Sequence, residues 1–118
     1  MSSHRSILIL GANGQIGTVL TEQLREKFGE RAVVASDIRE AKGSTGPFEI
    51  IDVTDGERLT EMIRKYKITE IYHLAAILSA TGEKMPLKTW DINMKGLLNV
   101  LEASRQETVS KVFFPSSI

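Results

Sequence analysis

Three glycines spaced three residues apart follow the first apolar run of the chain. The run at 7–10 leads directly into Gly11, Gly14 and Gly17, and no charged residue interrupts the stretch ILILGANGQIG. The first glycine permits a sharp turn out of a strand, the second lets the backbone approach a diphosphate, and the third lets a helix pack closely on the strand. A helix that starts near Gln15 points its free N–H groups and its dipole at such phosphates. The spacing therefore predicts a nucleotide-binding loop; the alternative is a plain strand–turn–helix corner, for which one glycine usually suffices.

A carboxylate lies about 20 positions beyond these glycines, where a ribose diol is bound in dinucleotide sites. The next apolar run, AVVAS, ends in Asp37. A carboxylate there accepts hydrogen bonds from two hydroxyls and repels a 2′-phosphate, so it favours NAD over NADP. The alternative is that Asp37 only caps a turn. Arg39 lies near Asp37 in the sequence and could bind a phosphate instead. Alternatively, Arg39 is a solvated surface charge.

The third apolar run is followed by Asp52 and Val53. If this run is a strand, Asp52 lies at the carboxyl edge of the sheet, where it can accept a hydrogen bond from an adenine amino group while Val53 packs on the ring. The alternative is a turn residue in front of a helix cap at Thr54. The residues alone favour the turn.

Two further polar residues lie among apolar ones. His73 is inside the run IYHLAA, and we interpret it as a hydrogen-bonded core residue rather than a catalyst or ligand. The small residues that end this run leave room for a ligand. Asn93 lies between Trp90 and Leu97 on one helical face, where an amide without a hydrogen bond costs a few kcal/mol. It either ties backbone together or serves an active site.

Short apolar runs alternate with helical stripes along the chain. The runs SILIL, RAVVAS, PFEIID, EIYHLAA and KVFFP suit strands that are covered on both faces. The first stripe consists of Ile16, Val19, Leu20, Leu24 and Phe28, with Gly29 as the expected C-cap. The second consists of Leu59, Met62, Ile63 and Tyr66, and the residues at 54–57 match a capping box with Thr54 as N-cap. A third helix is expected from near Pro86 to about Ser104, carrying Trp90, Met94, Leu97, Leu98 and Leu101.

This alternation predicts an α/β fold with a doubly wound, Rossmann-like parallel sheet. The expected strand order is 3-2-1-4-5, with a ligand crevice between the first and fourth strands. We expect residues 1–118 to form the N-terminal part of an NAD-binding domain, incomplete at its C-terminal side and without a second domain. The reason is that KVFFPSSI reads as a strand entering its loop.

The composition of the chain bears on which binding partners can be expected. The chain has 118 residues, 15 Lys and Arg against 15 Asp and Glu, and no Cys. The balanced charge gives no reason to expect a nucleic-acid partner. No apolar stretch approaches the ~20 residues that span a bilayer, so no membrane association is expected. We expect no metal site, and a cytoplasmic location is the default.

The chain resembles the extended short-chain dehydrogenase/reductase superfamily, which includes the NAD-dependent epimerases and dehydratases. The stretches that carry this resemblance together are GANGQIG, DIRE, DVTD, HLAA, WDINMKG and FFPSSI. The likeness is closest to the L-threonine 3-dehydrogenase branch, through GPFEIIDVTD, LAAILSATGEKMP and PSSI. It covers nearly the whole chain. The glycine loop is shared by many families, whereas the ILSATGE and GPFE–DVTD stretches discriminate much better.

The resemblance implies a set of site residues. Those for NAD are Gly11, Asn13, Gly14, Gln15, Ile16 and Gly17 in the pyrophosphate loop, Asp37, Ile38 and Arg39 at the adenosine ribose, Asp52 and Val53 at the adenine, and Leu74, Ala75 and Ala76 under the ribose and nicotinamide. Asn93 also belongs to the cofactor-binding set, as a match to an asparagine that supports the active site. Ser79 falls in the loop that faces the substrate, and Ser117 matches the catalytic serine, with Ser116 as its near competitor.

The implied reaction is oxidation of the β-hydroxyl of L-threonine to 2-amino-3-oxobutanoate, with a tyrosine as general base next to a lysine. The chain departs from the family here, because Tyr66 is followed four places later by Glu70 and Tyr72 by Ala76. We therefore expect this chain to supply the cofactor half and the serine without the Tyr-x-x-x-Lys pair. The alternatives are a nucleotide-sugar epimerase or dehydratase and a non-catalytic dinucleotide-binding regulator.

The resemblance also implies a homodimer of the full-length form, in which the third helix joins a four-helix bundle. Trp90, Met94, Leu98 and Leu101 can supply that face, although part of the stripe is expected to lie on the sheet. An open edge at the fifth strand is expected to make the 118-residue chain associate, in a non-native way.

Overall fold

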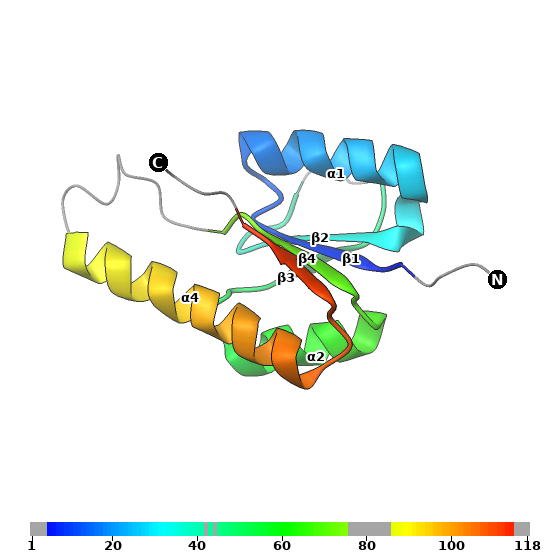
Figure 1. The fold of residues 1–118 in the computed structure, drawn as a ribbon. Coiled ribbons are helices and arrows are strands. Elements are labelled where there is room, and N and C mark those ends of the chain that lie inside the picture. Colours follow the sequence, from blue (N-terminus) through cyan, green and yellow to red (C-terminus); the bar gives the residue numbers. More distant parts are fainter. Residues whose placement is uncertain (1–4, 42, 44, 76–85, 115–118) are drawn as a thin grey trace.

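A parallel sheet lies between two helical layers (Figure 1). The computed structural model describes residues 5–41, 43, 45–75 and 86–114. Its elements are β1 (Ile7–Leu10), α1 (Gln15–Phe28), the short 3-10 helix η1 (Glu30–Ala32), β2 (Val33–Asp37), β3 (Phe48–Ile50), α2 (Gly56–Tyr66), β4 (Glu70–His73), α4 (Pro86–Gln106) and β5 (Lys111–Phe113). The five strands run in the order β3-β2-β1-β4-β5, which confirms the predicted order 3-2-1-4-5. Helix α1 covers one face, and α2 and α4 cover the other.

The central strand β1 divides the core into two clusters. Leu8 and Leu10 pack toward α2 and α4, whereas Ile7 and Ile9 pack toward α1. All four side chains are buried, and burying one such side chain contributes about 1.5–3 kcal/mol. The expected coverage of both faces therefore holds for β1. It does not hold for the two edge strands, whose side chains are half-buried or exposed.

Helix α1 approaches the sheet along its small and polar residues. Gly17, Thr21 and Arg25 are its buried residues, with Leu20, Leu24 and Phe28 packed beside them. Ile16 and Val19 were expected in the buried stripe, but they are 67% and 53% exposed. The cause is the close approach at Gly17, which turns the neighbouring bulky positions out of the contact. Gly29 ends the helix as expected, and its N–H donates to the Arg25 carbonyl.

Helix α2 begins one residue later than the capping-box pattern predicts. The N-cap is Asp55, whose carboxylate accepts a hydrogen bond from the Arg58 backbone at 3.1 Å. Thr54 is instead held in the preceding turn, where its N–H and hydroxyl both donate to Asp52 Oδ1. An aspartate in place of a threonine also puts a negative charge at the positive end of the helix dipole.

The β3 edge of the sheet is fastened to α2 by polar contacts. Glu49 accepts hydrogen bonds from the Tyr66 hydroxyl, from Lys65 Nζ at 3.2 Å and from Arg58 Nη2 at 3.3 Å. The bond from Tyr66 is the main reason that the pKa of Glu49 lies below its ordinary value, and the same bond raises the pKa of Tyr66. Tyr66 is therefore held protonated in a structural contact, which does not suit a general base.

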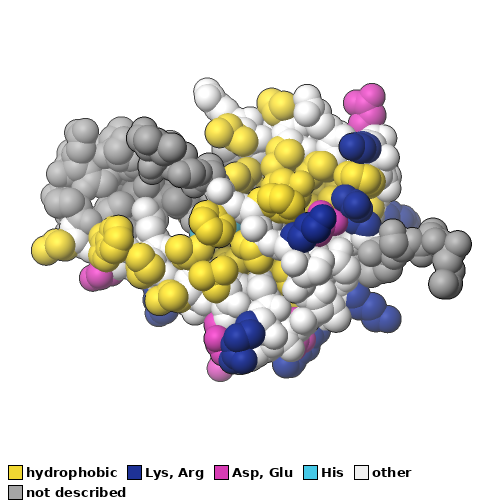
Figure 2. Space-filling model, in the orientation of Figure 1, with side chains coloured by type: hydrophobic (Ala, Val, Ile, Leu, Met, Phe, Trp, Pro, Cys, Tyr) yellow, Lys and Arg dark blue, Asp and Glu magenta, His cyan; other side chains and the backbone are white. Residues whose placement is uncertain are grey.

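The opposite edge presents aromatic surface. Tyr72 on β4 and Phe113 on β5 are stacked with their ring centroids 4.7 Å apart, and Phe113 and Phe114 are both exposed. Figure 2 shows hydrophobic side chains gathered across this part of the molecule, between α1 and α4. Burial raises the pKa of the Tyr72 hydroxyl, so this tyrosine is not poised as a base either. The predicted association of the chain depends on this surface and stays a prediction.

Helix α4 places its small residues against the core. Val100 and Ala103 are buried, whereas Trp90, Leu98 and Leu101 are exposed. Part of the expected stripe thus lies on the outer surface of the helix, as the sequence analysis allowed. Among the described residues, no helix has the length and apolar character that a membrane span needs.

His73 ends β4 inside the core. Its side chain is 7% exposed, and Nδ1 has no hydrogen-bond partner among the described residues. The predicted core position of His73 is confirmed, whereas the described residues provide no hydrogen-bond partner for Nδ1. Burial lowers the pKa of His73 from its ordinary value of 6.5, because the charged ring loses hydration.

Acidification should destabilise the fold through His73. In the unfolded chain His73 takes up a proton as the pH falls through 6.5, whereas in the folded chain it does so only at lower pH. Its contribution to the free energy of unfolding is therefore fully present above pH 6.5 and is lost as the pH falls below that value. Urea unfolding at pH 7.5, 6.5 and 5.5 should show a loss of stability that is reduced in His73→Met. His4→Gln measures what the second histidine contributes. An unchanged pH dependence in His73→Met would contradict this role.

Candidate functional site

The turn after β1 is held by the neighbouring strand β2. The Ser36 carbonyl accepts hydrogen bonds from Gly11 N at 3.0 Å and from Ala12 N at 2.9 Å. Gly11 has φ +88, and a Cβ on it would lie 2.8 Å from both Ala75 N and the Leu74 carbonyl carbon. Only glycine fits this crossing over the end of β4. The predicted turn role of Gly11 is confirmed.

Gly17 allows α1 to approach this turn. A Cβ at Gly17 would lie 2.4 Å from the Gly11 carbonyl oxygen and 2.8 Å from the Ala12 Cα. These are backbone atoms that cannot move away without shifting the turn. The predicted close packing of the helix on the strand is therefore confirmed, with the turn itself as the closest contact.

Gly14 has a different environment from the other two glycines. Its φ of −72 and ψ of 174 suit any residue, and a Cβ there would meet only the Gly11 carbonyl oxygen, at an ordinary 3.7 Å. The described part of the chain thus gives no steric reason for a glycine at this position. Open space beside the backbone is what a closely approaching ligand requires.

The start of α1 is open to an anion. Gly14 is the N-cap, no side chain of the described residues caps this helix start, and the first turn carries no acidic residue. Helices usually have Ser, Thr, Asp or Asn as N-cap, which satisfies amides that lack an intrahelical partner. The helix at Gln15 begins where the sequence predicts it, and its first-turn amides and dipole suit a negatively charged group.

Asp37 lies beside this turn, at the end of β2. Its Oδ2 accepts a hydrogen bond from Asn13 N at 3.0 Å, and its Oδ1 accepts one from Ile38 N at 2.7 Å. Asn13 also donates from its side-chain Nδ2 to the Arg39 carbonyl at 3.0 Å. The structure therefore brings the glycine turn and the carboxylate together, as the spacing of about 20 residues suggests. Nothing in that spacing pointed to the side-chain contact of Asn13.

Asp52 and Val53 lie at the same edge of the sheet but serve the fold directly. Asp52 Oδ1 accepts two hydrogen bonds from Thr54, which is the turn interpretation of this residue. Val53 is 8% exposed and packs where a Cβ on Gly96 would lie 2.7 Å from its Cγ2. The Val53 side chain is thus engaged in the core, and little of it is left to pack on an adenine ring.

The end of β4 forms the other wall of the turn. Leu74 N donates to the Leu10 carbonyl at 2.8 Å, and Leu74 and Ala75 are half-buried against Gly11. Asn93 is half-buried on α4. Three expected site residues, Ala76, Ser79 and Ser117, lie outside the described residues, as does Ser116.

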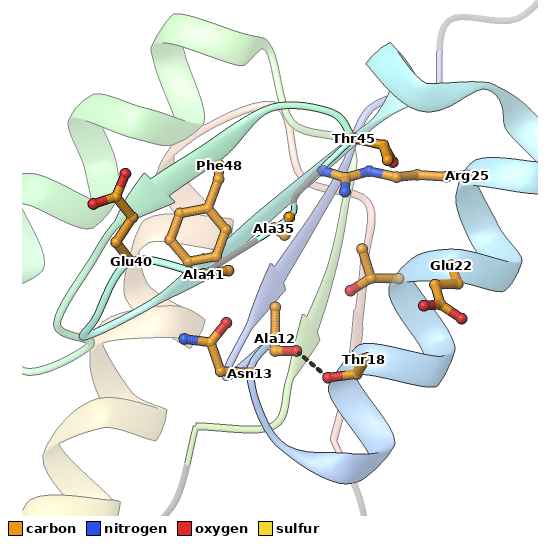
Figure 3. Close-up of a pocket in the computed structure, with 12 residues that line it drawn as sticks. Ala12, Asn13, Thr18, Glu22, Arg25, Ala35, Glu40, Ala41, Thr45 and Phe48 are labelled. Atoms are coloured by element: carbon orange, nitrogen blue, oxygen red, sulfur yellow. Dashed lines mark hydrogen bonds between the residues drawn. The ribbon is translucent and has the colours of Figure 1, made fainter.

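A pocket of about 450 Å³ lies between α1 and the connection from β2 to β3 (Figure 3). The Thr18 hydroxyl donates to the Ala12 carbonyl at its rim. Arg25 lines the pocket and donates through Nη2 to the carbonyls of Val33 and Pro47, at 3.1 and 2.6 Å. Arg25 thereby anchors the connection to the strand. The pocket adjoins the glycine turn, because Ala12 and Asn13 are among the residues that line it.

A parallel sheet in this strand order, with a glycine turn between its first strand and first helix, defines a Rossmann-like fold. The model of the NAD dependent epimerase/dehydratase family matches residues 7–118. The chain belongs to this family.

Known proteins resemble the chain over almost all of its length. An uncharacterized epimerase/dehydratase of Staphylococcus epidermidis is 50% identical over 97% of this chain. The L-threonine dehydrogenase of Clostridium difficile is 46% identical, with a TM-score of 0.89 over 98% of this chain. The holo form of a GalE-like L-threonine dehydrogenase from Cupriavidus necator is 45% identical, with a TM-score of 0.90 over 95%. In each case the chain spans about 37% of the relative's own length.

Alanine at Gly17 should destabilise the fold, whereas alanine at Gly14 should leave its stability almost unchanged. Gly17→Ala should lower the free energy of unfolding by about 1–3 kcal/mol or more, because the new methyl group meets backbone atoms. Gly14→Ala is the matched control and should leave stability within about 0.5 kcal/mol. Urea denaturation followed by circular dichroism measures both. Equal losses in the two variants would contradict the distinction between these glycines.

Proposed function

We propose that this chain binds NAD at the carboxyl edge of the sheet. The observation that supports this most directly is Gly14, a glycine without a steric reason in the described residues, at the uncapped start of α1 and beside Asp37. A diphosphate fits against the first-turn amides at Gln15 and Ile16, beside Gly14, whose own N–H donates to the Gly11 carbonyl at 3.4 Å. The chemistry of the residues thus suits the cofactor that the family name specifies.

We propose the remaining NAD contacts from the resemblance and from the neighbouring residues that the structure describes. Asp37 accepts hydrogen bonds from the adenosine ribose, with Ile38 and Arg39 beside it. Asp52 receives the adenine amino group through the oxygen that does not bind Thr54. Gly11 and Gly17 shape the loop. Leu74 and Ala75 would lie under the nicotinamide ribose, and the resemblance adds Ala76 to this group.

We propose further that the whole protein oxidises L-threonine to 2-amino-3-oxobutanoate. NAD would supply the hydride acceptor, and the protein's own groups orient the substrate and move its hydroxyl proton. Ser117 would hold the reacting oxygen, Ser79 would face the amino acid, and Asn93 would support the site. The support is the 45–46% identity to two L-threonine dehydrogenases.

A nucleotide-sugar epimerase or dehydratase is the second candidate, because the family and the staphylococcal relative are described as epimerases/dehydratases. A non-catalytic dinucleotide-binding regulator is a third. Extending the chain to the length of its relatives and assaying it with L-threonine and with nucleotide sugars separates the three. Oxidation of L-threonine alone supports the proposed reaction, and inactivity with every substrate supports the regulator.

The exposed residues of α4 suit a subunit contact in the whole protein. Trp90, Leu98 and Leu101 lie on its outer surface, and we propose that they contribute to a homodimer. Large exposed apolar residues on one helix favour such a contact.

Removing the carboxylate of Asp37 should weaken NAD binding. Asp37→Ala should cost roughly 1–3 kcal/mol of binding free energy, because the ribose hydroxyls lose their acceptor. Glu26→Ala removes an exposed carboxylate from the other end of α1 and is the matched control. Calorimetric titration with NAD, on protein shown to be folded, measures both. An unchanged affinity in Asp37→Ala would retire the ribose assignment.

The 118-residue chain alone should not turn over L-threonine. It has no Tyr-x-x-x-Lys, and the pKa values of Tyr66 and Tyr72 are raised rather than lowered. Absorbance at 340 nm, the wavelength for NADH, should therefore not rise above that of a mock preparation when NAD and L-threonine are added. Steady NADH production that depends on the chain would refute this.

A further inference from the structure

We propose that Asn13 is a positioning residue that joins the glycine turn to the segment after β2 and so prepares Asp37 for the adenosine ribose. This inference rests on the proposed NAD binding. It assigns Asn13 a role that acts through its neighbours, rather than through its own contact with the cofactor.

The contacts of Asn13 bridge two distant stretches of chain. Its backbone N–H donates to Asp37 Oδ2 at 3.0 Å, across a separation of 24 residues. Its side-chain Nδ2 donates to the Arg39 carbonyl at 3.0 Å, across 26 residues. One residue therefore binds both sides of the turn that carries Ile38.

The carboxylate is left oriented but not saturated. An ionised carboxylate offers about four lone-pair sites. The amides of Asn13 and Ile38 each fill one, on different oxygens of Asp37. The remaining sites suit a pair of adjacent hydroxyl donors, and a rotamer fixed before binding reduces the entropy lost when the ligand arrives.

The hydrogen bond from the Asn13 side chain is important because the segment after β2 is exposed and gains little stability from burial. Ile38, Arg39 and Glu40 are all exposed, and so is Asn13 itself. Figure 3 shows the Asn13 side chain beneath the connection that carries Glu40 and Ala41. A hydrogen bond from an amide is therefore a direct means of holding the Arg39 backbone in place. Alanine and aspartate at this position both lack the donor.

Two measurements on the 118-residue chain test the role. The first is amide hydrogen exchange at Ile38–Glu40 without nucleotide, which should be faster in Asn13→Ala and Asn13→Asp. The second is the affinity for NAD, which should fall about fivefold in Asn13→Ala, the effect of one net hydrogen bond. Asn13→Gln keeps the amide donor, so it should recover part of the slow hydrogen exchange and part of the affinity for NAD. Gln23→Ala, an exposed substitution on α1, is the control.

A double-mutant cycle separates positioning from direct contact. In an Asp37→Ala background, Asn13→Ala should weaken NAD binding by less than twofold, because it acts through Asp37. Additive losses, or weaker NAD binding with unchanged hydrogen exchange, would mean that Asn13 contacts the cofactor itself and would overturn the inference. Unchanged exchange and unchanged affinity would also overturn it. If the unaltered chain binds no NAD, the proposed function fails, whereas the exchange measurement still decides whether Asn13 holds the segment.

Discussion

The contact between Gly17 and the Gly11 carbonyl sets the geometry of the whole site. No Cβ fits between them, so α1 starts closer to the turn than a residue with a side chain at position 17 would allow. The turn itself is fixed because the Ser36 carbonyl accepts hydrogen bonds from two of its backbone amides. The Ser36 hydroxyl also donates a hydrogen bond to the Ile9 carbonyl at 2.7 Å. Strands β1 and β2 and the first turn of α1 are therefore located relative to one another by backbone contacts.

Much of this arrangement could be predicted from the sequence. The alternation of apolar runs and helical stripes predicted the strand order, and the glycine spacing predicted the start of α1 near Gln15. These features follow from strong local rules, because a glycine at positive φ or at a close approach has few substitutes. The position of Asp37 followed from the length of one strand–helix–strand unit.

The structure differs from the sequence-based predictions where tertiary packing determines which of several neighbouring residues is buried or caps a helix. A periodic stripe identifies one face of a helix, but the line of closest approach runs through Gly17 and Thr21, so Ile16 and Val19 turn outward. Asp55 rather than Thr54 caps α2, because Asp52 already holds Thr54. The bond from Asn13 to the Arg39 carbonyl crosses 26 residues. Such a contact leaves no periodic trace in a single sequence.

The uncapped start of α1 links the stability of the fold to the solution around it. A glycine N-cap forgoes only about a few tenths of a kcal/mol relative to a capping side chain, and an anion bound at this helix start would supply partners for the first-turn amides. A ligand that binds only the folded state adds about 2.7 kcal/mol of stability at one hundred times its dissociation constant. If an anion binds at this helix start, the resistance of the chain to proteases would rise and fall with the concentration of that anion, because proteolysis follows the population of the unfolded state.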